Sequence, residues 1–307
     1  PTSWAELAAV LKAKSAAAID LQGGDARISL AGAQDKASIA LFADGVPQLP
    51  RGTAPSTHIL KPDIRRLAKV RESAVNETVI MRTAARCGLP TAEVFYEPLT
   101  RACVVRRFDR VARADGGLDR LIQYDLCQLA GTVSEKKYEK EGGPNLAACA
   151  AIVRRTSSQP AVDLRHLVQW VFFNLYTGNN DSHAKNLSIY ELPGVGVRLT
   201  PFYDLMCTRI YPGLSREFAF SLGGEVLPGS VGREQVAALA RELGMGAPFL
   251  QKTALELARQ LPAALQGACD ELAPMLTPSG RVFLEKLRLW VLSNTAKTMA
   301  RVAGGVA

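Results

Sequence analysis

Two carboxylates and one carboxamide stand at a defined spacing in the middle of the chain. Asp181 precedes Asn186 by five residues, and Asp204 follows Asn186 by eighteen. An unperturbed Asp has a pKa of about 3.9, so Asp181 could accept the proton of an attacking hydroxyl or hold that hydroxyl in line. Asn186 and Asp204 offer the hard oxygen atoms that Mg²⁺ prefers beside phosphates and water. The set predicts a phosphoryl-transfer site that uses ATP and Mg²⁺.

The spacing Asp-x-x-x-x-Asn is the one that protein kinases use in their catalytic loop, with a metal-binding Asp further along. The sequence Asn-Asn-Asp-Ser at 179–182 is also good turn chemistry, so a helix-terminating turn is the alternative reading of Asp181 alone. Asp204 could likewise cap a turn at the end of a strand. His183 and Lys185 could contact phosphate or orient the loop. The three residues together favour the kinase interpretation.

A lysine ends an apolar strand expected at residues 56–61. Lys61 resembles the strand lysine that holds the α- and β-phosphates in protein kinases. Glu77, on the helix expected at 72–87, is its predicted ion-pair partner, and Glu72 is the alternative. Before this strand, the loop 31–36 is built of small and polar residues, with one glycine, Gly32. It is neither Gly-x-Gly-x-x-Gly nor a Walker A motif, although small residues let backbone N–H groups approach phosphates.

The periodicity of apolar residues divides the chain into a strand-rich first part and a helical second part. In the first part we expect helices at 4–14 and 72–87 and strands at 27–29, 37–42, 56–61, 93–97 and 102–108. In the second we expect helices at 123–130, 145–156, 163–177, 233–243, 247–259, 261–272 and 278–302, with a brief hairpin near 187–200. The fold class is therefore α+β, a two-lobed protein-kinase-like fold with a strand-rich N-terminal lobe and an all-helical C-terminal lobe. Residues 1–117 would form the ATP-binding lobe with the phosphate loop, and 118–307 the lobe with the catalytic loop and metal ligands.

Composition describes an ordinary globular protein, with 48% hydrophobic and 21% charged residues in a chain of 307. The net charge of +8 could attract ATP, acidic proteins or nucleic acid. No basic run is long or interleaved with aromatic residues, so we expect contact with DNA only indirectly. Six scattered cysteines without a Cys-x-x-Cys pair indicate a reducing, cytoplasmic location. We expect no signal peptide and no membrane span. The chain begins with Pro1, so either an initiator was removed or an upstream segment is missing.

Six motifs, in order, resemble the HipA family of serine/threonine kinase toxins from bacterial toxin–antitoxin modules. The similarity runs from about residue 27 to beyond 220. The motifs are Ile28–Lys36, Thr57–Lys61, Arg107–Arg110, Lys137–Glu139 with Gly142–Pro144, Asp181–Asn186 and Thr200–Asp204.

The resemblance implies a role for each matching residue. Asp181 would be the catalytic Asp, Asn186 and Asp204 the Mg²⁺ ligands, and Lys61 the phosphate-binding lysine. The remaining ATP-binding residues would be Ala31, Gly32, Ala33, Gln34, Asp35 and Lys36 in the phosphate loop, Arg106, Arg107 and Phe108 in the hinge beside adenine, and His183, Ala184, Lys185 and Tyr203 in the nucleotide pocket.

Ser29 matches the serine that the family autophosphorylates. In the family this modification expels the phosphate loop and silences the kinase. Added phosphate brings a charge of about −1.5 to −2 to the place that the phosphates of ATP must occupy. An ordinary strand serine is the alternative for Ser29.

Two departures from the family pattern bear on partners. Only 28 residues precede Ser29, whereas HipA carries an additional N-terminal subdomain. This resembles the short HipT toxins of HipBST modules, in which a separate small protein, HipS, supplies the missing part. HipT proteins often carry two serines in the loop, and here there is one. Arg106 stands where HipA has an acidic residue, but the hinge works largely through backbone groups.

The resemblance implies a HipB-like helix-turn-helix antitoxin and a HipS-like small protein as partners. It implies an aminoacyl-tRNA synthetase as substrate, glutamyl for HipA and tryptophanyl for HipT, so that translation and growth stop. Two other classes remain open. Asp-x-His-x-x-Asn also resembles the phosphoinositide-kinase loop, and aminoglycoside kinases share Asp-x-x-x-x-Asn, which would make the chain a small-molecule kinase. A non-catalytic corepressor that binds an antitoxin is the third.

Overall fold

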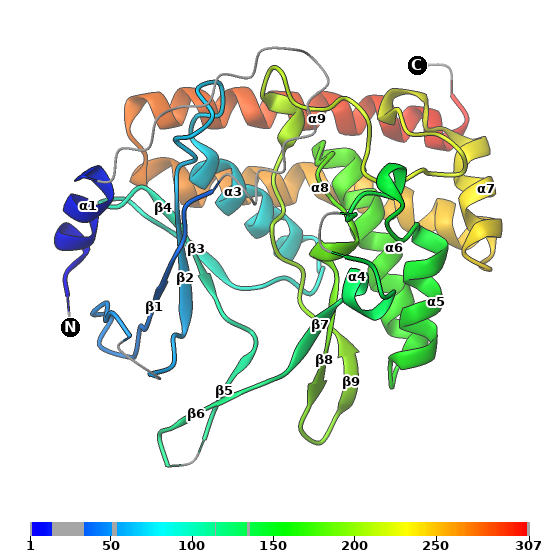
Figure 1. Cartoon of the computed structure of the whole chain (residues 1–307). Helices are drawn as coiled ribbons and strands as arrows, with labels where there is room; N and C mark the ends of the chain where they lie inside the picture. Colours follow the sequence, from blue (N-terminus) through cyan, green and yellow to red (C-terminus); the bar gives the residue numbers. More distant parts are fainter. Residues whose placement is uncertain (1, 14–33, 51–53, 114, 134–135, 306–307) are drawn as a thin grey trace.

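The computed structural model describes residues 2–13, 34–50, 54–113, 115–133 and 136–305. The expected strand at 27–29 and the residues Ser29, Ala31, Gly32 and Ala33 lie outside these ranges. The described chain has a strand-rich first part and a mainly helical second part, as the sequence predicted (Figure 1).

A four-stranded antiparallel sheet forms the centre of the first part. Its order is β1 (Ala37–Ile39), β2 (His58–Pro62), β4 (Ala102–Arg106) and β3 (Val94–Glu97). These four strands coincide with the expected ones within a few residues. Helix α1 (Trp4–Ala13) lies at the outer side, where Trp4 and Leu11 pack on Ile39 and Leu60 (Figure 1).

Side-chain alternation along β2 determines which way the lysine faces. Leu60 belongs to the small core under α1, together with Val104. Because successive side chains in a strand point to opposite faces, Lys61 faces the other way, toward helix α3 (Ser73–Arg86) and the main core. Its neighbour across the register, Cys103, belongs to that main core.

Two smaller sheets follow the first one along the chain. The hairpin of β5 (Arg110–Ala112) and β6 (Leu118–Arg120) contains the predicted domain boundary after residue 117, which stays a prediction. The second sheet consists of β7 (Gln123–Asp125), β8 (Ser188–Leu192) and β9 (Gly196–Leu199). Its β8–β9 hairpin is the one expected near 187–200, so the second part is helical around a small sheet.

The helix expected at 123–130 is partly wrong. Residues 123–125 pair with β8, and only α4 (Leu126–Leu129) is helical. Asp125 begins this helix with a capping box, in which its side chain accepts from the N–H of Gln128 and the Gln128 side chain accepts from the N–H of Asp125. Pairing with β8 therefore makes residues 123–125 a strand instead of the first part of a helix.

The longer helices of the second part are α5 (Leu146–Thr156), α6 (Pro160–Thr177), α7 (Arg233–Glu242), α8 (Ala247–Leu272) and α9 (Pro278–Ala303). The short 3₁₀ helices are η1 (Glu139–Glu141), η2 (Ala184–Asn186), η3 (Thr208–Ile210), η4 (Pro228–Ser230) and η5 (Ala273–Met275). None of the helices in the described part of the chain has the length and apolar character needed to cross a bilayer.

The two helices expected at 247–259 and 261–272 are one continuous helix. Pro262 lies inside α8, although proline removes a backbone hydrogen bond. Leu257, Leu261 and Leu265 are buried on both sides of it. Burial of this apolar stripe outweighs the local cost of the proline. Helix α8 in turn packs against both α3 and α9, which lie beside it in Figure 1.

Candidate active site

The end of α6 places the catalytic loop. The helix is buried on nearly all sides and ends at Gly178, whose φ is 72°. A Cβ at Gly178 would lie 2.3 Å from the ring of Trp290, so both the backbone angle and the space require glycine. Asn179 then donates to the Asn174 side chain at 2.8 Å, and its own side-chain oxygen accepts from the N–H of Asp181 at 3.3 Å. The loop thus leaves the helix in one defined direction.

Asp181 is held by a tyrosine from another segment. The hydroxyl of Tyr138 donates to Asp181 Oδ1 at 2.5 Å, and the ring of Tyr138 packs edge-on against His183 at 5.2 Å. Tyr138 is buried just before η1. The hydrogen bond orients the carboxylate that is the candidate for positioning a substrate hydroxyl.

Lys61 lies between two carboxylates. Its Nζ donates to Glu77 Oε1 at 2.6 Å and also contacts Asp204 Oδ1. Of the two expected partners, the structure pairs Lys61 with Glu77, while Glu72 pairs with Arg101. Burial opposes the charge on Lys61, but the two carboxylates outweigh it and raise the lysine pKa above its ordinary range.

The two acids beside Lys61 differ in their protonation equilibria. Burial raises the pKa of Glu77 above its ordinary value, although Lys61 opposes this. Burial also acts on Asp204, but there the Lys61 ammonium outweighs it and holds the pKa below the ordinary value. Asp204 is therefore the more firmly ionised of the two, as a metal ligand needs to be.

One polar side chain of helix α3, that of Asn76, fixes the helix relative to the segment that follows Asp204. The Asn76 side chain donates to the carbonyl of Cys207 at 2.9 Å and accepts from the N–H of Cys207 at 2.8 Å. It also donates to the hydroxyl of Tyr211 at 3.0 Å. Because Asn76 precedes Glu77 in the helix, these bonds hold Glu77, the ion-pair partner of Lys61, close to Asp204.

Asp204 itself has a left-handed backbone, with φ of 55°. Such a conformation is costly for a non-glycine residue and tends to occur at functional sites. The neighbouring Phe202 is tied to the first part of the chain, since its N–H donates to Pro90 and its carbonyl accepts from Ala92. Phe202 precedes Asp204, and Cys207, which is bonded to Asn76, follows it. The strained residue is therefore held from both sides.

The donor set fits a magnesium ion together with phosphates. The side-chain oxygen of Asn186 is buried and has no hydrogen-bond partner within the described ranges. Asn186, Asp204, Asp181, Gln34 and Glu77 line one small cavity, with Asn179 and Met206. No cluster of three or more His, Cys, Asp or Glu side chains in the described part of the chain could hold a metal. Two oxygen ligands plus phosphate and water are what Mg²⁺ takes in such sites.

His183 is neutral in this environment. Burial, followed by the positive charge of Lys137, lowers the pKa of His183 to about 3. Neither ring nitrogen has a hydrogen-bond partner among the residues that the structure describes. A neutral imidazole can donate one hydrogen bond to an anionic ligand without adding charge.

A second cavity of about 470 Å³ adjoins the first and is large enough for a small ligand. It shares Asn186 and Asp204 with the small one. Its lining comprises Lys36, Gln123, Asp125, Gln128, Lys137, His183, Lys185, Asn186, Ser188, Tyr203 and Asp204. The Tyr203 ring stands 5.8 Å from that of Phe108, and its hydroxyl is 2.7 Å from Ser188 Oγ. The two cavities together form one polar site with an aromatic border.

Some expected residues do not line these cavities. The side chain of Arg106 is 62% exposed and pairs with Glu93, and that of Arg107 pairs with Asp109. Asp35 pairs with Arg66 at 3.0 Å, and the Ala184 side chain is buried in the core. The expectation for Arg106 concerned its backbone. The backbone N–H of Arg106 donates to the backbone carbonyl of Glu93 at 2.8 Å. A role of Arg106 at a hinge would therefore not use this N–H.

Sequence reasoning missed Tyr138, Asn76 and Lys137 as parts of the site. Tyr138 and Lys137 stand within one of the six matching motifs, and that was the only signal for them. Asn76 offered none beyond its place before Glu77, because its partners lie 131 residues or more away.

The chain matches the family model described as HipA-like C-terminal domain over residues 28–266. Among curated proteins, it is 37% identical over 261 residues to the protein Y4mE of Sinorhizobium fredii, covering 83% of this chain and 60% of that protein. It is 31% identical over 277 residues to the serine/threonine-protein kinase toxin HipA of Shewanella oneidensis, covering 84% of this chain and 61% of the toxin. The chain thus spans about three fifths of the length of these relatives.

Among solved structures, the chain superposes on HipA of Shewanella oneidensis MR-1 in its complex with HipB and operator DNA. The TM-score is 0.83 at 26% identity, covering 99% of this chain and 72% of that one. The proinflammatory kinase CtkA of Helicobacter pylori shares the fold, with a TM-score of 0.50 at 13% identity over 94% of this chain and 98% of that one.

Proposed function

The chain belongs to the family of proteins with a HipA-like C-terminal domain, and from this premise we propose that it is an ATP- and Mg²⁺-dependent serine/threonine protein kinase. It would act as the toxin of a bacterial toxin–antitoxin system in the cytoplasm. The observation that carries the proposal is that Glu77, Asp204, Asp181 and Asn186 line one cavity. Lys61 contacts two of these residues, Glu77 and Asp204. Phosphoryl transfer needs these groups together.

Each side chain has a defined task in this proposal. Lys61, held by Glu77, binds the phosphates of ATP, and Asn186 and Asp204 hold the metal. Magnesium, when bound, neutralises charge that develops on the phosphates. Asp181, oriented by Tyr138, accepts the proton of the substrate hydroxyl or holds it in line. His183 stays neutral and can donate to a phosphate oxygen.

The partners follow from the relatives. The solved Shewanella protein is bound to HipB and operator DNA. We therefore propose a HipB-like antitoxin for this chain and contact with DNA only through it, with a HipS-like small protein as a second partner if the chain is a short-form toxin. The proposed substrate is an aminoacyl-tRNA synthetase, tryptophanyl or glutamyl. Ser29 remains the proposed autophosphorylation site, outside the residues that the structure describes.

The test uses radiolabelled ATP, Mg²⁺ and the two synthetases. The wild-type chain should label a synthetase, and Asp181→Asn should lower the rate by about 10²- to 10⁴-fold. Asp119→Asn is the matched control, because Asp119 is exposed on β6 and away from the site. Equal labelling by wild type and Asp181→Asn would overturn the proposal. Label found only in small molecules would favour a small-molecule kinase instead.

A further inference from the structure

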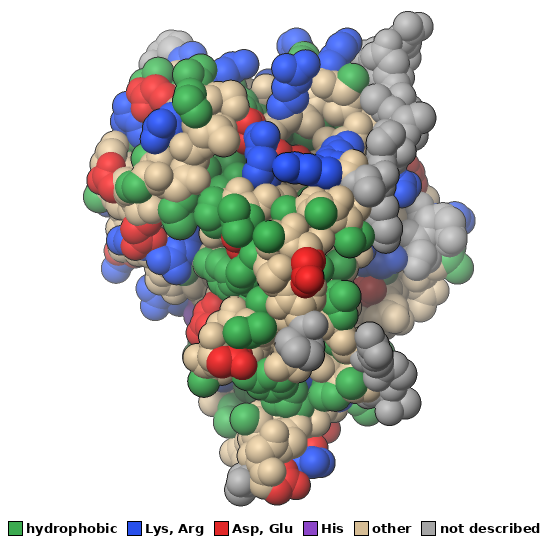
Figure 2. Space-filling model, turned by 90° about the vertical axis from the view of Figure 1, so that its left-hand side faces the viewer, with side chains coloured by type: hydrophobic (Ala, Val, Ile, Leu, Met, Phe, Trp, Pro, Cys, Tyr) green, Lys and Arg blue, Asp and Glu red, His purple; other side chains and the backbone are tan. Residues whose placement is uncertain are grey.

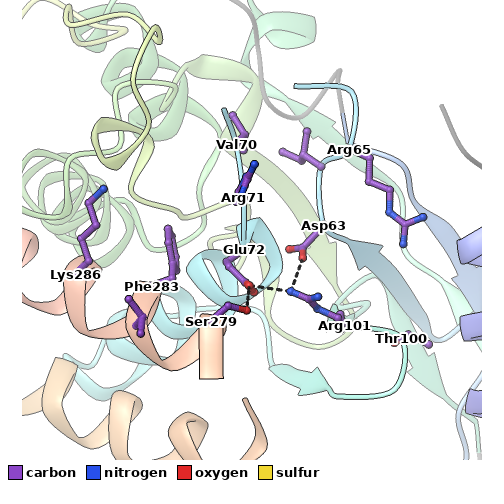
Figure 3. Close-up of a pocket in the computed structure, with 12 residues that line it drawn as sticks. Asp63, Arg65, Val70, Arg71, Glu72, Thr100, Arg101, Ser279, Phe283 and Lys286 are labelled. Atoms are coloured by element: carbon purple, nitrogen blue, oxygen red, sulfur yellow. Dashed lines mark hydrogen bonds and ion pairs between the residues drawn. The ribbon is translucent and has the colours of Figure 1, made fainter. Parts of the chain in front are cut away.

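A separate cavity of about 590 Å³ lies where the start of α3 meets the first turns of α9 (Figure 3). Its walls come from the segment before α3, from the β3–β4 turn and from α9. They comprise Asp63, Ile64, Arg65, Val70, Arg71, Glu72, Thr100, Arg101, Ser279, Val282, Phe283 and Lys286. None of these residues lines the two cavities of the candidate active site. Its volume is that of a pocket for a small molecule.

The two acids of this cavity are already satisfied. Arg101 donates to Glu72 at 2.8 Å and lies 3.6 Å from Asp63 (Figure 3). Glu72 also accepts from the hydroxyl of Ser279 at 3.2 Å, and Asp63 accepts from the N–H of Ala74 at 3.0 Å. These bonds connect α3 to α9 and leave the acids little capacity for another cation.

Two basic side chains of the cavity take no part in these ion pairs. Arg71 and Lys286 are exposed and have no ion-pair partner among the described residues. Arg65 donates to the carbonyl of Leu11 at 2.6 Å. With four basic and two acidic side chains on the wall, the lining carries an excess of two positive charges. Lys and Arg side chains also gather at the top of the molecular face on the α1 side (Figure 2).

The backbone is strained at the centre of this cavity. Glu72 has φ of 54° and Arg101 has φ of 51°, and the third non-glycine residue with positive φ in the described chain is Asp204 of the candidate active site. Non-glycine residues in this conformation are strained and persist where the surroundings hold them, which is typical of ligand-binding sites. Here the Arg101–Glu72 ion pair joins the two strained residues.

An apolar surface completes the cavity. The Val282 side chain is 73% exposed, and Phe283 is half-buried with its ring stacked on Tyr211 at 6.1 Å and 14°. In Figure 3, Phe283 and Lys286 extend from the same helix, and Arg71 lies across from them. Phe283 therefore lines the same cavity as Arg71 and Lys286, the two cations without an ion-pair partner in the described ranges.

We propose that this cavity binds a small phosphate monoester with a flat ring, whose phosphate lies between Arg71 and Lys286 and whose ring packs on Val282 and Phe283. A doubly charged phosphate suits two unpaired cations better than a single carboxylate does. The ligand would contact the connection between β2 and α3, the elements that carry Lys61 and Glu77.

Phenyl phosphate is the probe, titrated calorimetrically into the full chain with a non-hydrolysable ATP analogue and Mg²⁺ present in excess. One equivalent should bind. Arg71→Glu and Lys286→Glu should each weaken binding by about tenfold or more, the effect of losing one hydrogen bond to a charged group. Arg259→Glu, an exposed position on α8 outside the lining, makes the same change in net charge and should leave the Kd within about twofold.

Three results would overturn the proposal. They are the absence of phenyl phosphate binding, equal binding by wild type and both cavity variants, and equal binding of phenol, which has the ring without the charge. None of these results depends on kinase activity. A chain without phosphoryl transfer that still binds the probe through Arg71 and Lys286 would refute the proposed function and support this site.

Discussion

Lys61 and Asp204 are 143 residues apart in the sequence, and their charged groups are in direct contact. In the proposed reaction both must face the nucleotide, Lys61 toward phosphate and Asp204 toward the metal. Their mutual contact keeps each charge compensated while the nucleotide is absent. In the proposed reaction, MgATP would replace this contact, since its phosphates would pair with Lys61 and its metal with Asp204.

Asp204→Asn tests this exchange. The variant keeps the shape of the side chain but loses the charged metal ligand, so phosphoryl transfer should fall by about 10²-fold or more. Nucleotide affinity, measured by calorimetry, should lose most of its dependence on Mg²⁺. Wild-type dependence on Mg²⁺ in Asp204→Asn would contradict the assignment of this residue as a metal ligand.

Tyr138→Phe tests how Asp181 is oriented. The change removes one hydroxyl that donates to the carboxylate, and the ring can still pack against His183. We expect kcat to fall about tenfold, the size of one hydrogen bond to a charged group, with little change in KM for ATP. Tyr124→Phe is the control, since Tyr124 is half-exposed on β7. If both variants keep wild-type kcat, Tyr138 does not position Asp181.

His183→Gln tests the burial of a neutral imidazole. The pKa of His183 is about 3 in the folded protein and 6.5 in its ordinary state. Between these values the unfolded chain binds more protons, so His183 lowers the stability as the pH falls below 6.5. At pH 5 this costs about 2 kcal/mol relative to neutral pH. Urea unfolding at pH 7.5 and 5 should show a smaller acid-induced loss in the variant. An equal loss of unfolding free energy in both proteins would show that His183 takes up a proton as readily in the folded protein as in the unfolded chain.

Gly178→Ala tests the start of the catalytic loop. The new Cβ would meet the Trp290 ring at 2.3 Å in addition to the strain of a positive φ. Gly194→Ala has a similar φ of 76° but no atom within 4 Å, so it isolates the strain. We expect Gly178→Ala to cost about 1–3 kcal/mol more than Gly194→Ala in thermal or urea unfolding and to lower activity. Equal costs would mean that Trp290 moves aside.

The sequence predicted those features that depend on local pattern. Alternation and turn residues located the strands around Lys61, and the Asp-x-x-x-x-Asn spacing located Asp181 and Asn186. Features set by distant partners were not predictable. Strand β7 depends on pairing with β8, and helix α8 continues through Pro262 because the buried leucines on either side hold it. The Tyr138–Asp181 bond joins segments 43 residues apart and has no local pattern.

The most direct test of the account is a crystal structure of the chain with Mg²⁺ and a non-hydrolysable ATP analogue. We predict that the β- and α-phosphates contact Lys61, that the metal lies between Asn186 and Asp204, and that Asp181 faces the γ-phosphate. A nucleotide bound elsewhere, or a metal that does not contact Asn186 and Asp204, would contradict the account.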